Sequence, residues 1–151
     1  MPRPDLSELG DFLKWDGSLR DIYVFEADAA AWLQFVELIK RLPHTFFQGD
    51  KNTILHFDDI FFEQTESCLL TIYPNKLDLN CHFFTLQEIE IDLDIRCLAN
   101  RLNQDLLLDF VEALANAVNK PVSITPENQS ALPYITYTHA NGDWVKAYDR
   151  T

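Results

Sequence analysis

The sequence predicts an α+β fold built on a mostly antiparallel sheet. Three observations lead to this prediction: strict alternation of apolar and acidic residues at 88–94, an amphipathic pattern at 104–119, and two alternating runs within 67–83. Alternation with a period of two is typical of a half-buried strand, whereas a period of 3.6 indicates a helix. A strand with one apolar face followed by a helix with one apolar stripe can form the core of a domain.

Length and composition favour a single domain, residues 1–151, with peripheral ends at about 1–14 and 139–151. Hydrophobic residues make up 47% of the chain and aromatic residues 13%, unlike a disordered protein. A domain of this size buries roughly 70% of its unfolded surface, so it needs neither a disulfide framework nor a structural metal. We expect no cofactor.

Charge restricts the partners. The net charge is −12, and the twelve Lys and Arg residues are scattered along the chain. Binding to phosphate backbones requires a basic patch, so the sequence disfavours nucleic acid and anionic membranes as partners. A basic protein or a cation is favoured instead, because complementary potentials speed encounter and set specificity.

The amino terminus and the cysteines predict the compartment. The first ten residues are polar and lack the apolar core of a signal peptide, and no apolar run is long enough to span a bilayer. Three cysteines without CxxC spacing fit a reducing environment. We therefore expect a cytoplasmic protein.

The amino-terminal half predicts a strand at 19–25 and a helix at about 28–42. Apolar residues point to both sides of the strand, so we expect both of its faces to be covered. Asp28 is the expected N-cap of the helix, which carries a continuous apolar stripe and ends at Pro43. After it we expect two short strands, one at 46–47 and one at 54–57.

A meander of three strands is predicted at about 67–94. A tight turn at 73–76 joins the first two strands, and a three-residue loop joins the second to the third. The first hairpin then pairs Ile72 with Leu77, Leu70 with Leu79 and Cys68 with Cys81. The second pairs Phe84 with Glu88, His82 with Glu90, Asn80 with Asp92 and Asp78 with Asp94. A two-residue loop would mix polar and apolar faces, so it is excluded.

The carboxy-terminal half predicts a helix at about 104–119, capped by Asn103 and ended by Pro121. Its inner stripe consists of Leu106, Leu107, Phe110, Leu114 and Val118. Strands are expected to follow at 122–125 and at 132–137. The second should lie at the edge of the sheet, because it contains a proline that cannot donate to a neighbour. Both helices should pack on the apolar face.

Two acidic surfaces are candidates for partner binding, and they point in opposite directions. The acidic sheet face carries Asp78, His82, Glu88, Glu90, Asp92 and Asp94. The outward side of the last helix carries Asp109 and Glu112. Among these residues we expect His82 to titrate above an ordinary histidine, because carboxylates surround it.

Three interpretations of the acidic sheet face remain open: a solvated surface, a docking surface for a cationic protein, and a hard-metal site. Ca²⁺ and Mg²⁺ need converging oxygen ligands at about 2.0–2.6 Å, whereas carboxylates two residues apart on a strand diverge. We therefore expect no metal site.

Signatures of catalysis are missing from the sequence, so we expect a protein that is not an enzyme. There is no GxSxG or HExxH motif, and four glycines leave no room for a glycine-rich phosphate loop. The histidines are too dispersed for a zinc site, lying at positions 44, 56, 82 and 139. Cys68 and Cys81 are open to two interpretations, a pair of reduced core residues or a cross-strand disulfide.

The layout of this small, acidic, cysteine-poor chain, with WDGSLRDIYV at 15–24 and VSITPEN at 122–128, resembles one group of proteins. These are bacterial immunity proteins of the polymorphic-toxin and contact-dependent inhibition type. The resemblance implies a cytosolic protein that neutralises a basic toxin domain, often a nuclease, without catalysis. It implies no particular contact residues, because such families diverge in their contacts. The alternatives are a structural or stand-alone bacterial domain without a toxin partner, and a metal-dependent enzyme.

Overall fold

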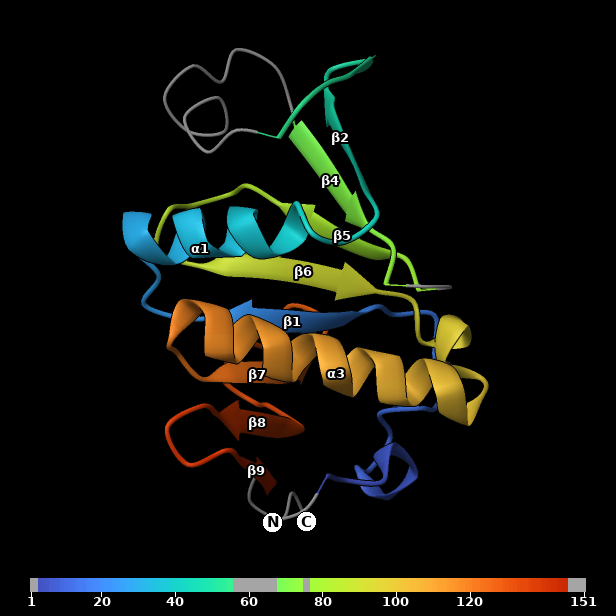
Figure 1. Cartoon of the computed structure of the whole chain (residues 1–151). Helices are drawn as coiled ribbons and strands as arrows, with labels where there is room; N and C mark the ends of the chain where they lie inside the picture. Colours follow the sequence, from blue (N-terminus) through green and yellow to red (C-terminus); the bar gives the residue numbers. More distant parts are fainter. Residues whose placement is uncertain (1–2, 56–67, 75–76, 147–151) are drawn as a thin grey trace.

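The computed structural model describes residues 3–55, 68–74 and 77–146, which form the expected α+β architecture (Figure 1). The strands are β1 (Arg20–Val24), β2 (His44–Gln48), β3 (Lys51–Asn52), β4 (Cys68–Ile72), β5 (Leu79–His82), β6 (Ile89–Leu93), β7 (Val122–Pro126), β8 (Ile135–Thr138) and β9 (Asp143–Lys146). They form one antiparallel sheet in the order β3-β2-β4-β5-β6-β1-β7-β8-β9. The helices are α1 (Ala29–Ile39) and α3 (Arg101–Val118), with 3-10 turns η1 (Leu6–Glu8) and η2 (Ile95–Leu98).

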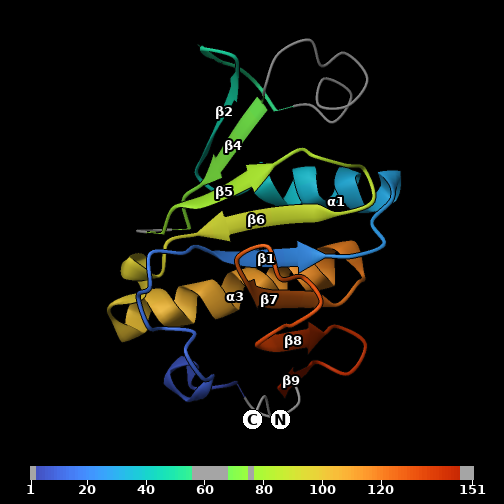
Figure 2. The same cartoon turned by 180° about the vertical axis from the view of Figure 1, so that it is seen from behind.

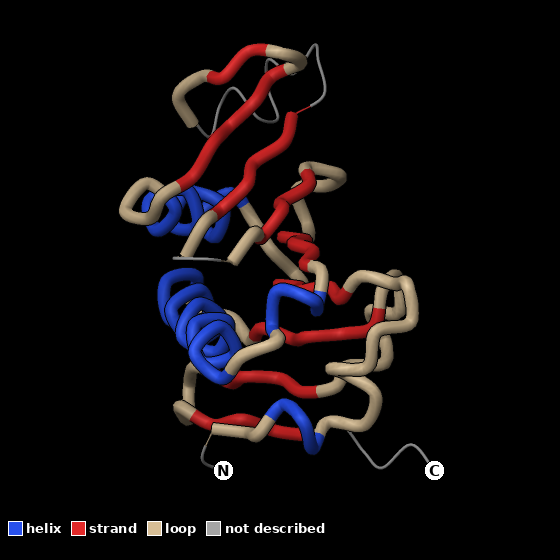
Figure 3. The backbone as a smooth tube through the Cα atoms, turned by 90° about the vertical axis from the view of Figure 1, so that its right-hand side faces the viewer, coloured by secondary structure: helices blue, strands red, loops and turns tan. Residues whose placement is uncertain are grey.

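Both α-helices cover the same side of the sheet. In Figure 1, α1 lies in front of β5 and β6, and α3 lies in front of β1 and β7. Seen from behind, the strands lie in front of both α-helices (Figure 2), and the side view shows these helices as a layer beside the sheet (Figure 3). Within the described residues, the two α-helices therefore cover one face of the sheet and leave the other free of α-helix.

Alternate residues of the central strands form the core beneath the helices, as the sequence predicts. Ile89, Ile91 and Leu93 are fully buried, because the period of two directs all three to the helix side. Trp32 of α1 is also fully buried, and its indole Nε1 donates to the main-chain oxygen of Leu86 at 2.7 Å. Trp32 therefore acts as a packing residue with a satisfied polar atom.

The cap prediction is right for α1 and wrong for α3. Asp28 accepts from a main-chain N–H in the first turn of α1 at 2.8 Å. In α3 the cap is Asn100, whose side chain accepts from the main-chain N–H of Asn103 at 2.8 Å. Asn103 is buried, and its Nδ2 donates to the main-chain oxygen of Cys97 at 2.7 Å. Both asparagines suit a cap, and only packing distinguishes them.

The predicted meander forms. The register of its second hairpin agrees with the prediction, and the register of its first hairpin differs. The second hairpin pairs His82 with Glu90 and Asn80 with Asp92, as expected. The first hairpin pairs Ile72 with Leu79 and Leu70 with Cys81, two residues away from the tight-turn prediction. The connection is longer because Leu77 is fully buried in the core instead of pairing. A shift of two keeps the apolar residues on the same face.

The observed register of the first hairpin separates Cys68 from Cys81. Because Cys81 lies opposite Leu70, Cys68 and Cys81 are not the cross-strand neighbours that a tight turn would make them. None of the three cysteines takes part in a disulfide among the described residues. Cys81 is buried, and Cys68 and Cys97 are half-buried.

The region after α1 differs in part from the prediction. β2 includes the expected strand at 46–47, but its hairpin partner is β3 rather than a strand beginning at Ile54. Ile54 and Leu55 have no strand assignment. The remainder of that predicted strand and the acidic break after it, at 58–59, lie outside the described residues.

Both ends of the chain are held more firmly than the sequence indicates. β8 is not an edge strand, because β9 pairs with it along its far side. Leu6 and Phe12, from the amino-terminal segment expected to be peripheral, are almost completely buried. Trp144, the residue of the carboxy-terminal tail that was expected to dock, is also buried. Among the described residues, no helix is both long enough and apolar enough to cross a membrane.

Candidate functional site

The face of the sheet opposite α1 and α3, here called the outer face, carries two rows of aligned side chains. The first row follows the strand register through Thr45, Thr71, Asn80, Asp92, Asp21 and Thr125. The second row, two positions along each strand, contains Phe47, Leu69, His82, Glu90, Tyr23, Ser123 and Thr136. Because the side-chain period is two, both rows point away from the helices.

Asp92 is at the centre of a hydrogen-bond network on this face. The Nε2 of His82 lies 2.5 Å from one carboxylate oxygen of Asp92, and the Nδ2 of Asn80 donates to the other at 3.4 Å. Thr71 donates in turn to the side-chain oxygen of Asn80 at 3.0 Å. The network therefore runs through β4, β5 and β6 and fixes the Asp92 carboxylate.

A second set of contacts extends from Tyr23 of β1. Its hydroxyl donates to Glu90 at 2.8 Å and lies 3.4 Å from a carboxylate oxygen of Asp21. The same oxygen of Asp21 accepts the main-chain N–H of Asn128 at 2.8 Å. Burial is the main cause that raises the pKa of Asp21 to about 6 and the pKa of Tyr23 above its usual value.

His82 lies between the acidic network and an exposed aromatic ring. The hydrogen bond to Asp92 is the main cause that raises the pKa of His82 above its ordinary value, in the direction that the sequence predicts. Glu90 and Asp21 add electrostatic contributions of the same sign. On its other side the imidazole stacks on Phe84, with centroids 5.3 Å apart and planes 10° apart. Phe84 is 71% exposed.

The outer face is covered at β1 and more open toward β2. Asp21, Tyr23 and Thr125 are almost completely buried, and the connection between β7 and β8 passes over this part of the face (Figure 2). Toward β2 the face remains accessible at six residues that we call the outer patch: Phe47, Leu69, His82, Phe84, Glu90 and Asp92.

The carboxylates of the outer patch are less exposed than the sequence indicates. The Asp92 side chain retains only 15% of its exposure, and Glu90 is half-buried. Asp78 is exposed and lies before β5, and Glu88 is half-buried and lies before β6. These two acids flank the network. The expected pair of Asp78 with Asp94 falls beyond the paired residues of the two strands.

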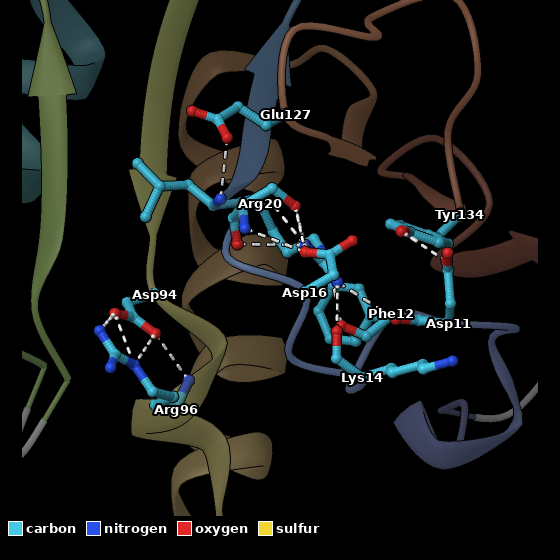
Figure 4. Close-up of polar contacts among 11 residues, drawn as sticks. Asp11, Phe12, Lys14, Asp16, Arg20, Asp94, Arg96, Glu127 and Tyr134 are labelled. Carbon is cyan, nitrogen blue, oxygen red and sulfur yellow. Dashed lines mark hydrogen bonds and ion pairs between the residues drawn. The ribbon is translucent and has the colours of Figure 1, made fainter.

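Asp94 belongs to a separate, structural group (Figure 4). It caps η2 and pairs with Arg96 at 2.6 Å, and this contact lowers the pKa of the Asp94 carboxyl. The guanidinium of Arg96 also lies over the ring of Trp15, 4.1 Å from its centroid. Asp94 therefore holds an arginine of its own chain rather than joining the outer patch.

The acids on α3 are also neutralised within the chain. Arg3 pairs with Asp109 and, at 2.8 Å, with Glu112, and this contact lowers the pKa of Glu112. Glu112 additionally accepts from the indole Nε1 of Trp144 at 2.9 Å. The α3 surface thus ties the amino terminus and β9 to the helix layer.

A polar pocket of about 510 Å³ at the start of β1 was not predicted from the sequence (Figure 4). Its walls include Asp11, Asp16 and Glu127, and Arg20 lines it with only 1% exposure. The sequence signal that could have indicated this pocket is Arg20, which lies at the start of a largely apolar strand. A charge buried there requires polar partners around it.

The groups of this pocket already have partners. The guanidinium of Arg20 donates, at 2.9 to 3.3 Å, to the main-chain oxygens of Asp11, Phe12, Lys14, Ser18 and Leu19. Asp11 accepts from the hydroxyl of Tyr134 at 2.8 Å, and Glu127 accepts from the main-chain N–H of Leu19 at 3.0 Å. The pocket therefore acts as a structural joint that fastens the amino-terminal segment to the sheet.

In the part of the chain that the structure describes, no three or more His, Cys, Asp or Glu residues converge as they would around a metal ion. The chain has no match among protein-family models, curated proteins or solved structures.

Proposed function

We propose that this protein is a non-catalytic binding module that recognises a basic protein through the outer patch. The observation behind the proposal is the difference in partners among its acids. Asp94, Asp109 and Glu112 each pair with an arginine of the chain, whereas within the described residues Glu90 and Asp92 pair with no arginine or lysine. A half-buried carboxylate without a full counter-ion gains free energy when a partner supplies the cation.

The function that fits this surface best is that of an immunity protein. A net charge of −12 favours fast association with a basic toxin domain, and a stable, non-catalytic surface is sufficient to neutralise one. Three cysteines without CxxC spacing fit a reducing compartment, and the proposal includes a location in the bacterial cytoplasm. The α3 surface is the weaker docking candidate, because Arg3 already occupies Asp109 and Glu112.

One observation favours the rival function, a stand-alone structural domain. The outer-face acids accept hydrogen bonds from His82, Asn80 and Tyr23, so they are satisfied without any partner. In that case the network would serve only to align β1, β5 and β6. The two functions differ in whether charge at Glu90 and Asp92 affects any binding event.

Parallel affinity capture from the native host tests the proposal. The baits are the wild type, the Glu90→Lys/Asp92→Lys variant, the milder Glu90→Gln/Asp92→Asn variant, and a Glu37→Lys control on exposed α1 surface. We expect wild type and control to retain the same basic protein and both outer-patch variants to lose it, with binding that weakens as salt increases. Co-expression with wild type should abolish the toxicity of the captured protein.

Two results would count against the proposal. Equal retention by all four baits would place the interface elsewhere, and an acidic partner would remove the electrostatic argument. Circular dichroism of each bait verifies that loss of binding does not reflect loss of fold.

A further inference from the structure

We infer that the partner of the outer patch is amphipathic as well as basic, and that it docks as a helix presenting leucine-like and arginine side chains on one face. This inference rests on the proposed function and adds the chemistry of the partner. The outer patch is divided into an apolar half, formed by Phe47, Leu69 and Phe84, and an acidic half, formed by Glu90 and Asp92.

The apolar half lies on the same face as the acids and is accessible. Phe47 and Leu69 face each other across β2 and β4, and Leu69 is 40% exposed. Phe84, on the far side of the His82 ring, is 71% exposed. Isolated exposed apolar residues are common, but a group of them beside carboxylates that pair with no arginine or lysine of the described chain is typical of an interaction surface.

The apolar half is also preorganised. Phe84 stacks on His82, whose ring is fixed by its contact with Asp92. A ring that is already held in place loses little conformational entropy when a partner covers it. The exposed face of Phe84 can accept an aliphatic side chain of the partner. The carboxylates of Glu90 and Asp92 favour arginine over lysine as the partner's cation, because a planar guanidinium can bind carboxylates through two donors.

The spacing of the two halves favours a helix. Leu69 of β4 and Glu90 of β6 are separated by two strand spacings, about 10 Å across the sheet. Two turns of an α-helix rise about 10.8 Å, so residues two turns apart can contact the apolar and the acidic half together. On an extended segment, residues about 10 Å apart are three positions apart and point to opposite sides.

Three synthetic alanine-based helical peptides of equal charge test the inference. The first carries two leucines one turn apart and two arginines two turns further along the same face. The second replaces its leucines with alanine. The third keeps the composition of the first but moves the leucines to the opposite face. Binding is measured by isothermal titration calorimetry and mapped by amide shifts of the full-length ¹⁵N-labelled chain.

We expect the first peptide to bind about tenfold more tightly than the other two, which corresponds to burial of roughly one aliphatic side chain. Phe84→Ala and Leu69→Ala should abolish that difference and leave binding of the second peptide unchanged. Leu102→Ala, which truncates a residue 60% exposed on α3, is the matched control and should change neither. Because Phe84 and Leu69 are exposed, their truncation removes little packing.

The remaining outcomes distinguish this inference from the proposed function. Equal binding of all three peptides, lost in the Glu90→Gln/Asp92→Asn variant, would overturn the amphipathic partner and leave a purely acidic docking surface. No binding of any peptide at low salt would overturn the inference and count against the proposed function as well. Self-association of the chain that Phe84→Ala abolishes would make a second copy the occupant and overturn the inference.

Discussion

The carboxylates at the periphery of the fold and those of the outer patch differ in what neutralises them. At the periphery, Asp94 and Glu112 pair with Arg96 and Arg3, and both carboxyl groups have a lowered pKa. On the outer face Glu90 and Asp92 accept from hydroxyl, amide and imidazole groups. Burial raises the pKa of their covered neighbour Asp21 to about 6. A carboxyl group beside an arginine therefore has a lowered pKa, whereas a carboxyl group buried without one has a raised pKa.

This difference separates acids that stabilise the fold from acids that are available to a partner. An acid that already holds an arginine offers little to a foreign cation, because the new contact replaces an old one. Glu90 and Asp92 hold no arginine or lysine among the described residues, so a partner cation adds an interaction there. The comparison can be tested by removing an arginine at the periphery of the fold or a carboxylate charge on the outer face.

The largest effect is expected from the arginine that anchors the amino-terminal segment. Arg20→Ala should lower the free energy of unfolding by about 3–5 kcal/mol, because several main-chain oxygens around the buried guanidinium lose their donor together. Arg20→Lys should recover only part of this loss, since an ammonium cannot reproduce the planar fork. Urea denaturation measures both variants.

The control for this prediction is Arg101→Ala, whose side chain is 68% exposed and pairs only at 3.6 and 3.8 Å. We expect a change below about 0.5 kcal/mol, as for other exposed ion pairs. If Arg20→Ala were equally mild, the pocket at the start of β1 would not be a structural joint, and its acids would join the outer patch as candidates for partner binding.

An opposite and smaller effect is expected at Asp21. Its pKa is raised from 3.8 to about 6, so between these values the folded state holds a proton that the unfolded chain has released. Stability therefore falls as pH rises from about 4 to 6. Asp21→Asn should remove this dependence and stabilise the protein at pH 8 by about 1–3 kcal/mol, because the buried charge disappears.

Denaturation midpoints measured between pH 4 and 8 test this sign. Glu37→Gln, which removes an equal charge from an exposed position on α1, should keep the pH profile of the wild type. A destabilising Asp21→Asn substitution would contradict the prediction, since it would mean that the ionised carboxylate, through its contact with the Asn128 N–H, supports the fold.

Much of the fold could be predicted because the sequence pattern and the burial agree. Ile89, Ile91 and Leu93 alternate with acids, and that pattern alone determines which face of β6 lies beneath the helices. The errors occur where a local rule allows two answers. Asn100 and Asn103 both suit a cap, and a connection two residues longer around Leu77 preserves the apolar face equally well.

The candidate site was harder to predict, because it depends on contacts between distant parts of the chain. The sequence places Glu90, Asp92 and His82 on one face, and the structure brings them together. Neutralisation of the α3 acids depends on Arg3 reaching that helix, a contact across more than a hundred residues that no local pattern encodes. The apolar half likewise appears only when β4 lies beside β2.

The smallest expected effect is a change in the pKa of His82, which distinguishes Asp92 of the outer patch from Asp94 at the periphery. Asp92→Asn should lower the pKa of His82, because the carboxylate contact is the main cause of its elevation. Asp94→Asn should leave it unchanged, since Asp94 pairs with Arg96. Both pKa values are measured by NMR titration of the imidazole.

A raised pKa of His82 also means that its contribution to stability is present below pH 6.5 and lost as pH rises through the folded pKa.

A wild-type His82 pKa at or below 6.5 would show that Asp92 does not hold the imidazole in solution. Phe84 would then lack the fixed ring on which it stacks, and the apolar half of the outer patch would lose its preorganisation. A pKa that falls equally in both variants would mean that Asp94 contributes to the outer-face field despite Arg96. The division into neutralised and available acids would then fail at β6, where the two aspartates lie closest in sequence.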